Sequence, residues 1–358
     1  MKVTDLRLLP HGGARLTSLG LGTAGLAGLY APASEAQARA TLQSAWDAGL
    51  RYFDTAPYYG HTLSEHRVGA FLREHPREAF VLSTKVGRLL FPDAGVRPMD
   101  NGWAHPLPFR PQFDYSYDGV MHSFEDSLQR LGLERIDMLY VHDIGRRTHG
   151  DGHAMHWTAL TRGGGFRAVE DLRDSGLIRA FGLGVNEAEV VHRCLQEARI
   201  DCTLLAGRYT LLEQDALPVL DECARHGQAI VIGGPFNSGL LAGNGKFDYA
   251  DAPAAMLSRA DALRATCAEF GVPVQAAALQ FPLAHPACVS CLTGARSPAE
   301  LEQNVAWFEQ PIPAAMWHAL RSQGLIGDTA PCPGDVAASA RAATPSDSII
   351  PNRPAVPC

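Results

Sequence analysis

Four side chains that could exchange protons follow short apolar runs of the sequence. Asp54 and Tyr59 lie in F-D-T-A-P-Y-Y-G, Lys85 in S-T-K-V, and His142 in Y-V-H-D. A free tyrosine has a pKa of about 10 and transfers protons poorly at neutral pH. A nearby ammonium favours the phenolate, and a carboxylate would hold that ammonium in place. If the apolar runs are neighbouring parallel strands, these residues predict an acid/base centre at one rim of the sheet.

Short apolar runs alternate about eight times with segments of helical periodicity. The expected strands are 16–21, 52–53, 80–86, 136–142, 180–186, 203–208, 229–233 and 289–294. The expected helices are 34–49, 64–75, 118–132, 165–176, 188–198, 215–226, 257–271 and 297–308. Ser34 with Gln37, and Ser297 with Glu300, have capping-box spacing. This alternation predicts a parallel sheet, and eight repeats favour one α/β domain, a (β/α)8 TIM barrel, over residues 1–330.

Two long stretches interrupt this alternation. Residues 87–117 follow the third expected strand and contain five prolines and six aromatic residues, and residues 143–164 follow the fourth. Both loops leave from the rim where barrels of this type hold their chemistry, so we expect them to wall the substrate pocket. Residues 331–358 are rich in Pro, Ala, Ser and Gly without periodicity, which predicts a disordered, flexible C-terminal tail.

The four polar residues, spaced 5, 26 and 57 apart, resemble the aldo-keto reductase superfamily. F-D-T-A-x-x-Y-G with a downstream S-T-K carries the resemblance, which extends from about Thr17 to about Gly327. It implies that Tyr59 is the general acid/base, that Lys85 and Asp54 tune it, and that His142 orients the substrate oxygen. It also implies a nicotinamide dinucleotide cofactor.

The resemblance further implies where that cofactor would bind. G-G-P-F-N-S-G is similar to the superfamily's pyrophosphate-embracing loop, and the helix after the eighth expected strand offers free N–H groups to a phosphate. Gln303 and Asn304 match positions that hydrogen-bond adenine. The expected cofactor residues are Gly22, Thr23, Asn186, Gly234, Pro235, Phe236, Asn237, Gly239, Leu241, Gly294, Ala295, Arg296, Gln303 and Asn304.

Three positions depart from the superfamily pattern. Val185 precedes Asn186 where a serine is frequent, and Gly233 replaces an aromatic residue that stacks on the nicotinamide. Glu300 occupies a position that is often an arginine for the 2′-phosphate of NADP. A carboxylate there repels a phosphomonoester, so the cofactor is expected to be NAD or NADP with NAD slightly favoured, since Arg296 could still serve NADP.

The resemblance is closest to the sugar-dehydrogenase branch, which contains L-fucose, L-galactose and D-threo-aldose 1-dehydrogenases, with pyridoxal 4-dehydrogenase alongside. H-D-I-G-R-x-T-H-G, R-Y-T-L-L-E-Q and the ending I-P-A-A-M-W-H-A-L-R-S-Q-G-L-I carry it. It implies oxidation of the C1 hydroxyl of an aldose to a lactone. The alternatives are oxidation of pyridoxal, a general NADPH-dependent aldehyde or ketone reductase, and a non-catalytic sensor barrel.

Three other patterns suggest different chemistry. Gly20, Gly22 and Gly25 match G-x-G-x-x-G, but a loop follows them where a Rossmann fold needs a helix. Cys288 and Cys291 have the spacing of a zinc pair but lack a second pair. His149, His153 and His156 could be metal ligands on a helix, but Gly150 and Gly152 argue against a helix there, so we expect a polar pocket wall and no metal.

Bulk composition narrows the choice of partners. The chain has 358 residues, 46% of them hydrophobic, and a net charge of −7. That charge favours neither nucleic acid nor an anionic membrane surface. The N-terminus lacks a signal-peptide core and the eight cysteines are scattered, so we expect a cytoplasmic protein with free thiols. We expect a small-molecule substrate, and a monomer or small homo-oligomer.

Overall fold

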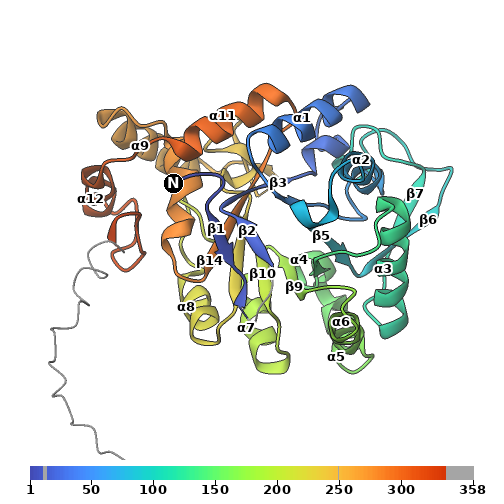
Figure 1. Ribbon diagram of the computed structural model, residues 1–358. Coiled ribbons are helices and arrows are strands. Elements are labelled where there is room, and N and C mark those ends of the chain that lie inside the picture. Colours follow the sequence, from blue (N-terminus) through green and yellow to red (C-terminus); the bar gives the residue numbers. More distant parts are fainter. Residues whose placement is uncertain (11–13, 249, 336–358) are drawn as a thin grey trace, which may run out of the picture.

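The computed structural model describes residues 1–10, 14–248 and 250–335, and its centre is a closed barrel of eight parallel strands (Figure 1). Neighbouring strands follow chain order around the barrel. They are β3 (Leu19–Gly22), β4 (Tyr52–Asp54), β5 (Val81–Val86), β8 (Met138–His142), β9 (Ala180–Val185), β10 (Cys202–Ala206), β11 (Ala229–Gly233) and β14 (Cys288–Gly294). The predicted (β/α)8 barrel is confirmed, and a Rossmann fold is excluded.

Helices surround the barrel, as Figure 1 shows. They include α1 (Glu35–Asp47), α2 (Leu63–Leu72), α3 (Tyr117–Leu131), α6 (Gly165–Asp174), α7 (Ala188–Glu197), α8 (Leu217–Arg225), α9 (Ala254–Glu269), α10 (Val274–Gln280), α11 (Pro298–Glu309) and α12 (Ala314–Ser322). The capping box of Ser34 and Gln37 is present in full. At the start of α11 the Ser297 hydroxyl accepts a hydrogen bond from the Glu300 N–H.

Apolar side chains pack in two layers on either side of the strands. Tyr52, Met138 and Tyr140 are among those that fill the barrel interior. The outer layer, which includes Phe53 and Leu139, packs between the strands and the surrounding helices. Because both faces of the sheet are buried, the strands form continuous apolar runs, as parallel strands do.

Each of the two insertions contains regular structure. The first forms an antiparallel hairpin of β6 (Arg88–Pro92) and β7 (Phe109–Phe113). The second contains α4 (Arg146–His149), a 3-10 turn (Gly150–Gly152) and α5 (His153–Thr161). The two glycines interrupt the helix between His149 and His153, as expected, although α4 and α5 flank them. Gly150 has a φ of +50°, which ends α4, and α5 begins directly after Gly152.

Small hairpins and turns complete the described chain. β1 (Leu6–Leu8) pairs with β2 (Arg15–Thr17), and β12 (Lys246–Phe247) pairs with β13 (Ala250–Asp251). After α12, Cys332 is buried and Asp335 accepts a hydrogen bond from Arg321. The described chain therefore continues five residues past the expected domain end at 330, and the rest of the expected tail, 336–358, lies outside the described residues.

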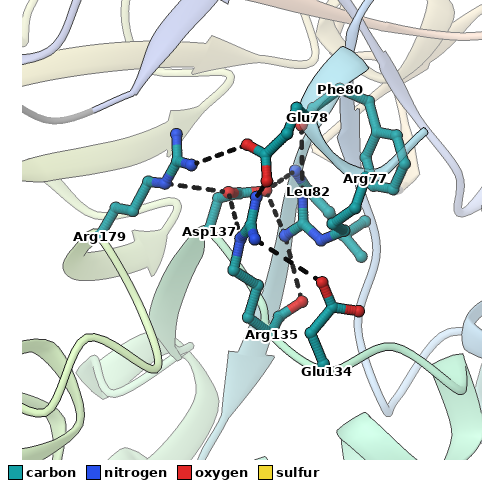
Figure 2. Close-up of polar contacts among 8 residues, drawn as sticks. All are labelled: Arg77, Glu78, Phe80, Leu82, Glu134, Arg135, Asp137 and Arg179. Atoms are coloured by element: carbon teal, nitrogen blue, oxygen red, sulfur yellow. Dashed lines mark hydrogen bonds and ion pairs between the residues drawn. The ribbon is translucent and has the colours of Figure 1, made fainter.

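A charged cluster lies at the N-terminal ends of the strands, on the rim opposite the four candidate residues (Figure 2). Its centre is Asp137, which is fully buried just before β8. Its carboxylate accepts hydrogen bonds from Arg77 at 2.7 Å and from the Leu82 N–H at 2.9 Å. Arg179 lies 3.5 Å from the second oxygen. Figure 2 also shows Arg135 pointing toward this carboxylate, so the cluster ties together the starts of β5, β8 and β9.

The cysteines are buried throughout the described part of the chain. Cys194, Cys202, Cys223, Cys267, Cys288, Cys291 and Cys332 are all free thiols, and Cys358 lies outside the described residues. Among the described residues, no group of three or more His, Cys, Asp or Glu side chains is arranged to hold a metal ion. The helices within this part are all too short or too polar to cross a membrane.

Candidate active site

The four candidate residues lie together at the C-terminal rim of the barrel. Asp54 ends β4, Lys85 lies near the end of β5, and His142 ends β8. Tyr59 follows β4 in the turn Tyr58–Gly60. The Lys85 ammonium donates hydrogen bonds to Asp54 Oδ2 at 2.7 Å and to the Thr55 carbonyl at 2.9 Å. It lies 4.6 Å from the centre of the Tyr59 ring, and the Tyr59 and His142 rings meet edge to face, 6.0 Å apart.

Burial and charge act in opposite directions on these groups. Burial is the largest influence on Tyr59 and raises the pKa of its phenol, whereas the Lys85 charge lowers it without overcoming burial. The Lys85 charge therefore lowers the pKa of Tyr59 as expected, but the pKa is raised overall because the effect of burial is larger. Burial alone would lower the pKa of Lys85, but Asp54 and Tyr59 outweigh it, so the ammonium keeps its charge.

His142 is a neutral imidazole at neutral pH. Burial lowers its pKa well below the ordinary value, and the charges of Arg88 and Lys85 act in the same direction. A neutral imidazole can donate one hydrogen bond and accept another, which suits it to orient an oxygen. The backbone beside it is held in place, because the Tyr115 hydroxyl donates to the His142 carbonyl at 2.8 Å.

A cavity of about 760 Å³ opens in front of these residues. Tyr59, Lys85 and His142 lie in its wall, and Asn186 lines it from the end of β9. The two insertions supply seven more residues of the wall. The first supplies Arg88, Asn101, Trp103, Pro111 and Phe113, and the second supplies Asp143 and Thr148. Both insertions therefore line this cavity, as the sequence predicts.

A second groove, of about 360 Å³, meets the first cavity at Tyr59. Eight of the expected cofactor residues line it: Gly22, Gly234, Pro235, Phe236, Gly239, Gly294, Ala295 and Arg296. A Cβ added at Gly22, Gly234 or Gly294 would meet no protein atom closer than 3.8 Å. These glycines keep the floor of the groove open, so a pyrophosphate could approach the backbone closely, as a dinucleotide requires.

Asn186 lines the first cavity, and the five other expected cofactor residues line neither cavity. The Thr23 hydroxyl is buried and donates to the Asp54 carbonyl, and Asn237 is buried against Thr210 and Glu213. Leu241 is fully buried and Gln303 is exposed on α11. The Asn304 amide donates to Thr293 Oγ1 at 3.0 Å and to the Gly294 carbonyl at 3.1 Å. Thr23, Asn237 and Asn304 thus shape the backbone of the groove.

Two of the departures from the superfamily pattern have structural partners. A Cβ added at Gly233 would lie 3.2 Å from Leu204 Cδ1, and Leu204 lines both cavities. Leu204 therefore occupies the space beside Gly233. Glu300 Oε2 accepts a hydrogen bond from the Arg296 N–H at 2.9 Å, and the two side chains form an ion pair of 3.5 Å. The cation expected to serve a 2′-phosphate is already paired.

Residues beyond the expected set also contribute to the first cavity. Tyr58 lies 5.6 Å from Trp103, and the Arg88 guanidinium lies 3.9 Å above the Tyr58 ring. Arg88 forms an ion pair with Asp143. The sequence holds a signal for three of these residues. Tyr58 and Asp143 are adjacent in sequence to Tyr59 and His142, and Trp103 lies in the aromatic-rich first insertion. No sequence signal places Arg88 against Asp143, because that contact depends on how the hairpin folds.

A buried lysine–carboxylate pair under a tyrosine, beside a glycine-floored groove, is the arrangement that the sequence resemblance implies for a nicotinamide-dependent oxidoreductase. The Aldo/keto reductase family model matches residues 18–323, and the chain belongs to this family. It is 54% identical over 343 residues to a pyridoxal 4-dehydrogenase from Microbacterium luteolum, covering 91% of this chain and 99% of the relative. It is 40% identical over 324 residues to a D-threo-aldose 1-dehydrogenase from a Pseudomonas species, covering 88% and 96%.

More distant relatives agree on family and fold. An L-galactose dehydrogenase from Arabidopsis thaliana is 28% identical over 311 residues, covering 86% of this chain and 88% of the relative. The solved structure of an aldo-keto reductase from Bacillus halodurans superimposes with a TM-score of 0.67 at 24% identity, covering 90% and 96%. This structural likeness supports the barrel fold. Members of the family use nicotinamide dinucleotides.

Proposed function

We propose that the protein oxidises the hydroxyl-bearing carbon of a cyclic hemiacetal to a lactone. The observation that carries this proposal is the similarity to two dehydrogenases over almost their whole length, 54% and 40% identical. Pyridoxal and aldoses both form cyclic hemiacetals, and oxidation at that carbon turns either ring into a lactone. Pyridoxal and an aldose oxidised at C1 are therefore the two candidate substrates, and the higher identity favours pyridoxal.

The proposed roles follow from the geometry around Tyr59. Its phenolate takes the proton of the hemiacetal hydroxyl as the carbon loses hydride, and the Lys85 ammonium stabilises that phenolate. Asp54 holds the ammonium through the 2.7 Å hydrogen bond. The neutral His142 imidazole donates to the same substrate oxygen and orients it. The bound nicotinamide ring supplies the hydride acceptor.

The groove residues favour NAD as that acceptor. Glu300 lines the groove and is paired with Arg296, so a 2′-phosphate there would compete with a carboxylate for the same cation. NAD has no such phosphate and avoids the competition.

The test is a panel of substrates with each dinucleotide. Pyridoxal, L-fucose, L-galactose and D-arabinose are incubated with NAD or NADP, and the absorbance of the reduced nicotinamide is followed. We expect turnover of at least one cyclic hemiacetal with NAD, and the lactone as product by mass spectrometry. An enzyme that reduces simple aldehydes with NADPH and oxidises none of these compounds would instead be a general aldehyde reductase.

A further inference from the structure

Arg88 is held unusually firmly for a charged residue in a cavity wall. Its side chain is 6% exposed, and its guanidinium lies between the rings of Tyr58 at 3.9 Å and Phe113 at 5.0 Å. It donates a hydrogen bond to Asp143 Oδ2, and Arg88 Nε has no hydrogen-bond partner among the described residues. Cation–π contacts on two sides fix the guanidinium without neutralising it. The Asp143 carboxylate neutralises the charge of the guanidinium.

Asp143 faces the cavity more openly than its partner does. Its side chain is 23% exposed, and it has a φ of +49°, a conformation unusual for a residue other than glycine. Oδ2 is shared between Arg88 and His142 Nε2, which lies 3.5 Å away. Oδ1 has no hydrogen-bond partner within the part of the chain that the structure describes. Because the side chain is 23% exposed and lies in the cavity wall, Oδ1 can accept a hydrogen bond from a ligand in the cavity.

Asp143 is the negatively charged hydrogen-bond acceptor among the described residues of the cavity wall. The described charged residues in the wall are Lys85, Arg88 and Asp143. The Lys85 ammonium is hydrogen-bonded to Asp54 and lies beside Tyr59, so its charge is already paired. Tyr30, Tyr58, Trp103 and Phe113 supply apolar and aromatic surface. A substrate oxygen near His142 therefore has one fixed carboxylate next to it.

We propose that Asp143, positioned by Arg88, determines specificity by binding a second substrate hydroxyl close to the reacting carbon. In an aldose this is the C2 hydroxyl, and in pyridoxal it is the ring hydroxyl next to the carbon that bears the aldehyde. The inference rests on the proposed function for the position of the reacting oxygen between Tyr59 and His142. It adds that the substrate class is hydroxylated at the neighbouring position, and that a plain aldehyde or lactol is a poor substrate.

The test compares matched substrates that differ only in this hydroxyl. In the oxidation direction they are D-ribose and 2-deoxy-D-ribose, and in the reduction direction lactaldehyde and propanal. We expect wild-type kcat/KM to favour the hydroxylated member by roughly tenfold to 100-fold, which is the size of effect of one hydrogen bond to a charged group. In Asp143→Asn we expect most of that preference to disappear, because kcat/KM falls much more for the hydroxylated member than for the hydroxyl-free member.

Arg88→Met tests the positioning role, and Arg110→Met is the matched control. Arg110 lies on the same hairpin and pairs with Asp93 at 3.8 Å, but it lines neither cavity. We expect Arg88→Met to lose part of the preference and Arg110→Met to keep all of it. Melting temperatures show whether Arg88→Met is folded, and the near-isosteric Asp143→Asn decides the question if it is not.

Two results would overturn the inference. The first is a wild-type kcat/KM that favours the hydroxylated substrate by less than about threefold in both oxidation and reduction. The second is a fall in kcat/KM in Asp143→Asn that is equal for both substrates of a pair. Failure of the proposed function looks different, because lactaldehyde would still be preferred over propanal while no hemiacetal is oxidised. A protein that turns over none of these four compounds overturns both.

Discussion

At the scale of single residues, the phenol of Tyr59 is subject to two opposing influences. Burial raises its pKa, and the Lys85 ammonium 4.6 Å from its ring opposes that rise. A proton-transfer group works best when its pKa is near the working pH. Burial moves the pKa of Tyr59 away from that optimum, so we expect the proposed proton transfer to depend on the Lys85 charge.

We expect Tyr59→Phe to lower kcat by about 10²–10⁴-fold, since the phenol oxygen alone exchanges the proton. The ring remains, so its packing against Trp103 and His142 is kept. Dinucleotide binding, measured by quenching of protein fluorescence, should stay close to wild type. A variant that keeps more than roughly a tenth of wild-type kcat would contradict the role of Tyr59 as general acid/base.

Lys85→Met removes the charge that opposes burial, so the pKa of Tyr59 should rise further. Oxidation needs the phenolate, and the phenolate fraction at a given pH falls when the pKa rises. We therefore expect a lower rate at neutral pH, and we expect the rising limb of the kcat/KM profile for oxidation, where the phenolate forms, to move to higher pH. Lys246→Met, an exposed lysine on β12, is the control. An active Lys85→Met enzyme with an unshifted profile would show that Lys85 does not tune the phenol.

Site residues at the ends of strands can be predicted from sequence motifs more easily than site residues whose positions depend on how a loop folds. Asp54, Lys85 and His142 could be brought to one rim by prediction, because parallel strands place their carboxyl ends together. Arg88 and Asp143 could not be paired in advance, since their contact depends on the β6–β7 hairpin and on the positive φ of Asp143. The tuning of Tyr59 by burial is likewise a property of the folded site.

At the scale of elements, the start of α11 combines helix capping with the lining of the glycine-floored groove. The Ser297 hydroxyl accepts from the Glu300 N–H, and the Glu300 carboxylate accepts from the Arg296 N–H. Glu300 therefore closes the N-terminus of α11 and also occupies Arg296. The capping spacing is visible in the sequence, whereas the contact with Arg296 is not, because that contact needs the backbone turn before the helix.

We expect Glu300→Arg to shift the ratio of kcat/KM values toward NADP by roughly tenfold. The reason is that like-charge repulsion near a surface is worth about 1 kcal/mol or a little more. Steady-state kinetics with both dinucleotides measures the ratio. Glu300→Gln, which removes the charge but keeps an acceptor for the Arg296 N–H, should give an intermediate shift. A wild-type enzyme that already prefers NADP strongly would refute the assignment.

In the second insertion, the glycines predict the break but not the helix that follows it. Two glycines within four residues suggest a break, and the chain does break at Gly150. Helix α5 nevertheless starts at His153, where it is anchored because the buried His153 ring contacts the Ile144 carbonyl at 2.9 Å. That tertiary contact overrides the weak local propensity.

At the scale of the whole molecule, the two rims of the barrel are specialised differently. The C-terminal rim carries the two cavities of the candidate site, and the N-terminal rim carries the cluster around Asp137 shown in Figure 2. Barrels commonly separate activity and stability in this way. The barrel itself could be predicted from eight strand–helix repeats, but the Asp137 cluster could not, because its arginines come from three separate connections.

We expect Asp137→Asn to destabilise the protein by about 3–5 kcal/mol, because it removes a buried carboxylate from its ion pair with Arg77, whose side chain is only 10% exposed. Urea unfolding followed by circular dichroism gives the free energy of unfolding. Asp174→Asn is the control: its side chain is 76% exposed and lies 3.7 Å from Arg173, so we expect a loss below about 1 kcal/mol. The kcat of folded Asp137→Asn should match wild type, and a large drop would show that the rims are coupled.

The buried thiols can serve as probes of local unfolding, because each one reacts only when the structure around it opens. Burial raises the pKa of each of the seven described cysteines, so a thiolate-seeking reagent meets an unreactive and covered sulfur in each of them while the barrel is closed. They are spread over α7, β10, α8, α9, β14 and the segment after α12. In a Cys358→Ser background, pulsed alkylation followed by peptide mass mapping would therefore show which part of the barrel opens first, and in what order the others follow.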